Sequence, residues 1–341
     1  MKIRRIYGVL FTSVVFTAVA CSPKTDVSAS VKKDSTAEVQ SENSELVINR
    51  NPIDTADYNR RMKMLANGDT TGKWPAKMVY PLPGAIFPYH RVVAYYGNLY
   101  SKKMGVLGEY PRDEMLAKLK VEVKKWHDAD TSLPVIPALH YIAVTAQSNG
   151  GKQRLRMPFK QIDTILNWAK QINGLTFLDV QVGWSTLQEE IPELDKYLAM
   201  PTVHLGIDPE FSMKFGDVPG KRIGTYNSDD INFVIDHLAD IVRKNNLPPK
   251  VLVVHRFTQG MVTNVANIKN VPEVQVVMDM DGWGDRILKK SSYLLYIYKE
   301  PVQFAGFKLF YKNDIKNGDH VMYTPQELNK FIPKPVYIQY Q

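Results

Sequence analysis

The feature that most constrains the fold is a repeat of strand-like and helix-like segments that starts at residue 91. Short runs rich in β-branched residues alternate with longer amphipathic runs, a pattern typical of βα units that form a parallel sheet. The expected strands are Val92–Gly97, Val135–Val144, Leu175–Val182, Val203–Glu210, Val251–Phe257, Val274–Asp281, Phe304–Lys312 and Val336–Tyr340.

Between these strands, apolar residues recur at the three- and four-residue spacing of an amphipathic helix. The expected helices are Asp113–Asp128, Ile162–Ile172, Thr186–Leu198, Asp229–Lys244, Met261–Lys269, Asp285–Tyr298 and Thr324–Phe331. A further short helix is expected before the first strand, at Asp54–Ala66.

Eight strands with helical connections within about 250 residues match the size and period of a (β/α)₈, or TIM-type, barrel. The last expected strand ends at the C-terminus, so the eighth helix is expected to be missing. The helix at Asp54–Ala66 would then cover that gap or close the bottom of the barrel. The alternative is an open doubly wound sheet, which typically carries a glycine-rich phosphate turn after its first strand. This chain has no such turn there, and the α/β barrel is the favoured fold class.

The N-terminus has the pattern of a bacterial lipoprotein signal peptide. A basic start is followed by the apolar run Val9–Ala20, which is too short to span a bilayer. Small residues then precede Cys21, the order that signal peptidase II recognises. We therefore expect cleavage after residue 20 and lipid on Cys21; an ordinary secretory signal is the alternative. The expected location is the bacterial cell envelope, membrane-anchored and either periplasmic or surface-exposed.

The predicted organisation has four parts. Residues 1–20 are the signal peptide, and residues 21–50 are a lipidated cysteine with a disordered tether, because this stretch is polar and has no aromatic residue. Residues 51–90 are an N-terminal extension that packs on the barrel, and residues 91–341 are the barrel domain. Cys21 is the only cysteine, which excludes an internal disulfide and a cysteine-based metal cluster.

The charge of the chain favours an envelope setting over nucleic acid. Removing a signal that holds Lys2, Arg4 and Arg5 lowers the formal net charge from +8 to +5. Mild basicity of this kind suits anionic lipids or glycans. No dense basic stripe with interleaved aromatic residues is present, so nucleic acid is not an expected partner.

Ionisable and polar residues gather near the C-terminal ends of the expected strands. In each strand, residues two apart face the same way, and most of these residues share the parity that points into a barrel. Active sites of such barrels lie at this face, and isolated buried charges are costly. The residues are Tyr96, His140, Asp179, Gln181, Asp208, Glu210, His255 with the adjacent Arg256, Asp279, Asp281, Lys308 and Gln339.

The fourth strand ends in Asp208-Pro209-Glu210, which would place two carboxylates on one face, roughly 7 Å apart along the strand. One carboxylate can then keep the other protonated near neutral pH, as a glycosidic general acid requires. This strand end resembles that of glycosidase barrels such as muramidase-type lysozymes and chitinases. The chain departs from the chitinase pattern at Val203 and Gly206, where that pattern has acids.

On this reading, the general acid is Glu210, its partner base or nucleophile is Asp179 or Asp281, and Asp208 tunes the acid. The polar side chains around them orient substrate: Tyr96, His140, Gln181, His255, Arg256, Asp279, Lys308 and Gln339. Trp184 and Trp283 follow the third and sixth strands, and their rings would stack on sugars or pack a loop onto the barrel.

The region from Arg91 to Gln341 also resembles a family of bacterial barrel lipoproteins that has no assigned activity. The likeness supports the fold and the anchor and implies no substrate. It is carried by Tyr96–Asn98, Gly105–Pro111, His204–Lys214, Val254–Thr258 and Met280–Gly284.

Two other functions remain open from the sequence. A metal-dependent hydrolase could draw ligands from His140, His255, Asp179, Asp208 and Asp279. Against it, the chain has no His-x-His pair on the first strand, and the histidines on strands two and five are expected to lie too far apart to share an ion. A non-catalytic glycan- or peptide-binding lipoprotein could use the same mouth. The favoured reading is a glycosidase with a glycan substrate and with neither metal nor cofactor.

Overall fold

The structure is a computed structural model of the chain, and it describes residues 51–341. The predicted signal peptide, Cys21 and the tether lie outside the described residues. Among the helices of residues 51–341, none combines the length and apolar composition that a membrane span requires.

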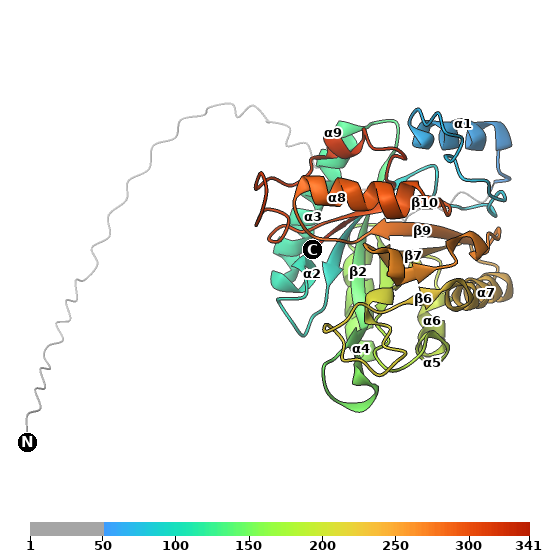
Figure 1. The fold of residues 1–341 in the computed structure, drawn as a ribbon. Coiled ribbons are helices and arrows are strands. Elements are labelled where there is room, and N and C mark those ends of the chain that lie inside the picture. Colours follow the sequence, from blue (N-terminus) through green and yellow to red (C-terminus); the bar gives the residue numbers. More distant parts are fainter. Residues whose placement is uncertain (1–50) are drawn as a thin grey trace, which may run out of the picture. The chain divides into compact units, whose positions relative to one another are not determined.

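Eight parallel strands close into a barrel, which confirms the predicted fold class (Figure 1). Each strand pairs with the next one along the chain, and the last pairs back onto the first, with Val92 opposite Tyr337. The strands are β1 (Arg91–Gly97), β2 (Val135–Ala146), β4 (Leu175–Val180), β5 (Val203–Ile207), β7 (Lys250–Arg256), β9 (Val274–Met280), β10 (Phe304–Leu309) and β11 (Tyr337–Tyr340).

The larger helices lie outside these strands (Figure 1). They bury apolar faces against the outward-facing strand residues, as Trp126 and Ile235 illustrate. The helices are α1 (Thr55–Ala66), α2 (Val106–Glu109), α3 (Arg112–Ala129), α4 (Phe159–Lys170), α5 (Leu187–Glu190), α6 (Asp195–Leu198), α7 (Ser228–Asn245), α8 (Arg286–Tyr293) and α9 (Pro325–Leu328).

One predicted helix, Met261–Lys269, is wrong. The connection after β7 consists of two 3₁₀ turns, η4 (Gln259–Met261) and η5 (Val265–Asn267), on either side of the short strand β8 (Val262–Thr263). This strand pairs in parallel with β6 (Tyr226–Asn227). Asn264 adopts the left-handed conformation, with φ 56°, and this interrupts any helix through the segment.

Two other predicted helices are divided. Thr186–Leu198 becomes α5, the 3₁₀ turn η2 (Pro192–Leu194) and α6, because Pro192 has no amide hydrogen to donate. Asp285–Tyr298 becomes α8 followed by the π-helical turn η6 (Leu294–Tyr298). The remaining short elements are η1 (Gly151–Gln153), the strand β3 (Arg154–Arg156) antiparallel to β2, and η3 (Pro209–Phe211).

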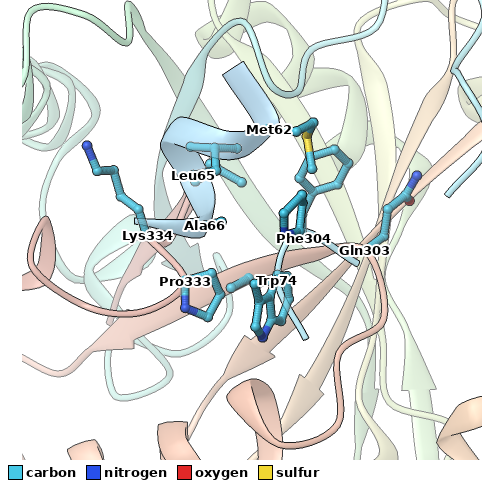
Figure 2. A pocket seen from close by; sticks show the side chains of 11 residues that line it. Met62, Leu65, Ala66, Trp74, Gln303, Phe304, Pro333 and Lys334 are labelled. Atoms are coloured by element: carbon cyan, nitrogen blue, oxygen red, sulfur yellow. The ribbon is translucent and has the colours of Figure 1, made fainter. Parts of the chain in front are cut away.

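Apolar side chains close the amino-terminal end of the barrel. Phe87, fully buried, contacts Phe304 with ring centroids 5.1 Å apart, and Tyr58 and Met62 of α1 join the same core. Helix α1 therefore covers the bottom of the barrel. Figure 2 shows a small, largely apolar pocket at this end, where Met62 and Leu65 of α1 lie near Trp74 and Phe304. A polar site has to lie at the opposite, carboxyl end of the strands.

Candidate active site

The carboxyl end of the barrel holds a group of polar side chains, all of them buried except Glu210, which is partly exposed. Strand alternation aims those that lie on strands inward, because they share the parity of the apolar residues Ala94, Phe177 and Val253 that fill the barrel below. We call this group the mouth cluster: Tyr96, His140, Asp179, Gln181, Asp208, Glu210, His255, Asp279, Asp281, Lys308 and Gln339.

Asp179 of β4 lies at the centre of the mouth cluster. Its Oδ2 accepts a hydrogen bond of 2.9 Å from the Tyr96 hydroxyl. Its Oδ1 lies 3.4 Å from His140 Nε2 and 3.5 Å from His255 Nε2. Gln181 donates to the same Tyr96 hydroxyl at 3.2 Å. Strands from opposite sides of the barrel thus meet at one carboxylate.

His255 links this centre to the upper part of the mouth. Its Nδ1 lies 3.4 Å from Asp279 Oδ2 and 3.2 Å from Asp281 Oδ2. Asp281 in turn pairs with Lys308, whose Nζ is 2.8 Å from its Oδ1. The same ammonium lies 3.8 Å from the centre of the Tyr96 ring, a cation–π distance. Asp281 therefore lies between the Lys308 ammonium and the His255 ring.

The Asp208-Pro209-Glu210 segment is not the strand end that the sequence predicted. Strand β5 stops at Ile207, and Asp208 caps the 3₁₀ turn η3 by accepting the Glu210 amide at 3.1 Å. Because a proline follows Asp208, the ladder cannot continue, and the two carboxylates do not share a strand face. Asp281 and His255 still act on the pKa values of both groups.

The carboxyls of the mouth cluster differ in their pKa values. Burial, reinforced by the charge of Asp281, raises the pKa of Glu210 to about 7. Burial raises the pKa of Asp208 well above its ordinary value, although His255 opposes it. Burial also disfavours the charge on Asp281, but Lys308 and His255 outweigh it and lower the pKa of that carboxyl. Near neutral pH, Glu210 holds a proton for part of the time while Asp281 is ionised.

The tryptophans predicted to hold sugar lie on loops after β4 and β9, outside the mouth cluster. Trp184 is 45% exposed, and its Nε1 donates to the Asp217 carbonyl at 2.7 Å. Trp283 is 53% exposed. Both loops follow carboxyl ends of barrel strands, so the exposed rings lie at the same end of the molecule as the mouth cluster.

Arg256 does not join the mouth cluster. It follows His255 in β7, so strand alternation turns it to the outside of the barrel, where its Nη1 lies 2.7 Å from Glu300. Lys312, which continues the line of Lys308 in the sequence, also lies outside and pairs with Glu109. Asp285 caps α8 by accepting the Leu288 amide.

Two residues at the centre of the site were not predicted from the sequence. The Tyr337 hydroxyl meets Nδ1 of His140, and its inward parity with Gln339 was the available signal. Gly206 faces the same centre, because a Cβ built on it would lie 2.5 Å from both Asp179 Oδ1 and His140 Nε2. In the sequence, only the absence of a side chain at Gly206 could have indicated that this residue faces the site.

The expectation that the two histidines lie too far apart is wrong. The rings of His140 and His255 have centroids 5.6 Å apart, although β4 and β5 stand between their strands in the sheet order. Closure of the barrel brings both rings to its axis.

Comparison with models of known protein families and with curated proteins finds no match to this chain. The barrel and its mouth are therefore the basis for assigning a function.

Proposed function

We propose that the mouth cluster is the active site of a glycoside hydrolase in which Glu210 is the general acid and Asp281 is its ionised partner. The observation that carries this is a pair of mouth-cluster carboxyls whose pKa values are shifted in opposite directions, upward for Glu210 and downward for Asp281. Glu210 is partly exposed and has a pKa of about 7, while Asp281 is ion-paired with Lys308. Glycosidic cleavage uses two carboxyls whose pKa values differ in this way, so that one can be protonated while the other is ionised.

The chemistry follows from these positions. The protonated carboxyl of Glu210 gives its proton to the glycosidic oxygen as the bond to the anomeric carbon breaks. The carboxylate of Asp281 either takes a proton from an attacking water or itself attacks the anomeric carbon. Lys308, 2.8 Å away, keeps Asp281 ionised for this role.

Asp281 suits the partner role better than Asp179, the other residue that the sequence suggests. Asp179 is fully buried, with one oxygen bonded to Tyr96 and the other facing two histidines. Asp281 follows the end of β9 and retains some exposure.

The proposed substrate is a glycan of the cell wall or cell surface. The exposed rings of Trp184 and Trp283 at the carboxyl end offer apolar faces on which sugar rings can stack. The predicted anchor at Cys21 fits a substrate that does not diffuse, because a flexible tether of 29 residues, from 22 to 50, would have a reach of roughly 30 Å.

The test is a hydrolysis screen of the full-length protein against peptidoglycan and common polysaccharides. We expect Glu210→Gln and Asp281→Asn to reduce turnover of the accepted glycan about 10²- to 10⁴-fold without loss of folding. The matched control is Glu193→Gln, a half-exposed glutamate paired with Arg156, which should keep full activity. Full activity in Glu210→Gln, or glycan binding without hydrolysis in the wild type, would contradict the proposal.

Metal-dependent hydrolysis is the second candidate, because His140, Asp179 and His255 offer one ligand atom each within a short distance of one another. Chelation separates the two functions. A glycosidase that relies on Glu210 and Asp281 alone keeps its turnover after chelator treatment, whereas a metal-dependent hydrolase loses it and regains it when metal is returned.

A further inference from the structure

His140, Asp179 and His255 bring ligand-type atoms together at one point inside the barrel. A ligand atom of each residue lies within 4.8 Å of those of the other two. Nε2 of His140 lies 3.4 Å from Asp179 Oδ1, and Nε2 of His255 lies 3.5 Å from the same atom. All three side chains have 0% exposure, so bulk water does not solvate them.

These atoms have no hydrogen-bond partner within residues 51–341. His140 Nε2, His255 Nε2 and Asp179 Oδ1 are all buried and unpartnered in this part of the chain. The distances of 3.4 and 3.5 Å exceed the roughly 2.7–2.9 Å of a charge-assisted hydrogen bond. Buried polar atoms are almost always paired, so this arrangement points to a ligand shared by the three residues.

The spacing is that of metal ligands. A tetrahedral zinc ion with bonds of about 2.0–2.1 Å to nitrogen and oxygen holds its ligand atoms about 3.3–3.4 Å apart. The two nitrogen–oxygen distances around Asp179 Oδ1 agree with this value to within about 0.2 Å.

Gly206 leaves the space that an ion needs. A Cβ at this position would lie 2.5 Å from Asp179 Oδ1 and 2.5 Å from His140 Nε2, so any side chain here would fill the region between these two atoms. The glycine has an ordinary backbone conformation, since it is absent from the residues with positive φ. The close approach of Asp179 and His140 explains the glycine at this position better than a turn does.

The surrounding contacts are those that hold metal ligands in orientation. The Tyr96 hydroxyl donates to Asp179 Oδ2 at 2.9 Å. His255 presents its other nitrogen to Asp281 and Asp279, and His140 presents its other nitrogen to the Tyr337 hydroxyl. Carboxylates and hydroxyls in these places fix the imidazole tautomer and the ring orientation of ligating histidines.

The charges of the mouth cluster also favour a cation. The mouth cluster holds five carboxyl groups. Among the described residues, Lys308 is the lysine that forms an ion pair with one of them, Asp281. A buried excess of carboxylates is costly unless protons or cations neutralise it. The carboxyls are Asp179, Asp208, Glu210, Asp279 and Asp281.

We propose that His140 Nε2, Asp179 Oδ1 and His255 Nε2 bind one divalent transition-metal ion at the base of the mouth cluster. Two imidazoles and one carboxylate form a ligand set that suits Zn²⁺ and disfavours Mg²⁺ and Ca²⁺, which bind through oxygen. This site does not rest on the glycosidase proposal. Neither Glu210 nor Asp281 is among the proposed ligands, and His255, whose Nδ1 lies 3.2 Å from Asp281 Oδ2, links the two sites.

The test uses full-length protein without a histidine tag, stripped with a chelator and titrated calorimetrically with ZnCl₂ and, separately, with MgCl₂. We expect one equivalent of Zn²⁺ per chain, an increase in Tm with Zn²⁺ concentration, and no response to Mg²⁺. Elemental analysis of protein as purified provides a second measure of occupancy.

Variants of the ligands should weaken Zn²⁺ binding in a graded order. His140→Ala, His255→Ala and Asp179→Asn should each reduce affinity by more than about 100-fold, and Tyr96→Phe, which removes only an outer hydrogen bond, by about 10-fold. The matched control is His204→Gln, because His204 is also a buried, inward-facing histidine but its Nδ1 accepts the Val251 amide.

A pair of glycine variants keeps the test valid if a ligand variant fails to fold. Gly206→Ala should abolish binding without removing any ligand. Gly306→Ala, whose Cβ meets Asp279 at the same 2.5 Å, should retain it. Failure of folded wild-type protein to take up Zn²⁺, or uptake unaffected by His140→Ala and Gly206→Ala, would overturn the proposal, whatever the outcome of the hydrolysis screen.

Discussion

Asp281 and Glu210 show how neighbours set the chemistry of identical functional groups. His255 lowers the pKa of both carboxyls, but Asp281 also has the Lys308 ammonium at 2.8 Å. That contact offsets the cost of burial for Asp281, whereas burial raises the pKa of Glu210 to about 7. In the proposed mechanism, the division of roles between acid and ionised partner thus depends on Lys308, a residue far from both in the sequence.

The burial of Lys250 predicts how the stability of the protein depends on pH. It is fully buried at the start of β7, donates to the Val203 carbonyl at 2.9 Å, and burial lowers its pKa to about 7. Between pH 7 and 10.5 the unfolded chain therefore holds a proton that the folded chain has lost, so stability rises with pH by up to about 1.4 kcal/mol per pH unit.

The measurement is the free energy of urea unfolding between pH 7.5 and 9.5. Lys250→Met should have a smaller slope with pH than the wild type, while Lys269→Met, at an exposed lysine paired with Asp236, should keep the wild-type slope. Equal slopes in all three proteins would refute the assigned pKa.

At the scale of elements, the sequence predicted the strands and their inward parity well. Alternation correctly placed His140, Asp179 and Lys308 inside, because a period of two is fixed by strand geometry. It failed where strands end. Glu210 lies in a 3₁₀ turn because Pro209 stops the ladder, and Met261–Lys269 forms no helix because Asn264 turns left-handed. Where a strand or helix ends depends on local contacts that the hydrophobic periodicity of the sequence does not reveal.

The amino-terminal closure makes a prediction at this scale. Gln275 of β9 accepts the amides of Ile86 and Phe87 and donates to the Phe87 carbonyl, so one side chain fixes the segment that closes the barrel. Gln275→Met preserves volume but leaves these buried groups unpaired, and it should lower the free energy of unfolding by at least about 2 kcal/mol. Gln326→Met, at an exposed position on α9, should change it by less than about 0.5 kcal/mol in the same urea titration.

At the scale of the whole molecule, eight βα repeats predicted the closed barrel. They could not predict which mouth residues meet. His140 and His255 stand on strands that are three apart in the sheet, and their contact depends on how the barrel closes and on the side chains that fill it. The metal-ligand geometry therefore became visible only in three dimensions, as did the contact between Lys308 and Asp281.

The predicted lipid anchor at Cys21 leads to a prediction about lipidation and membrane association of the whole protein. Wild-type protein expressed in a bacterium should incorporate labelled fatty acid and sediment with membranes. Cys21→Ser should do neither, because the lipid acceptor is lost. Lipid labelling of Cys21→Ser at the wild-type level would disprove the predicted lipidation site.

The central claim, that Glu210 protonates the departing oxygen, is tested most directly by comparing two glycosides of the accepted sugar with different leaving groups. An alkyl glycoside needs protonation for departure, whereas a 2,4-dinitrophenyl glycoside does not. We predict that Glu210→Gln cleaves the alkyl substrate at least about 100-fold more slowly than the wild type and cleaves the dinitrophenyl substrate at nearly the wild-type rate. Equal losses on both substrates would contradict the assignment of Glu210 as the general acid.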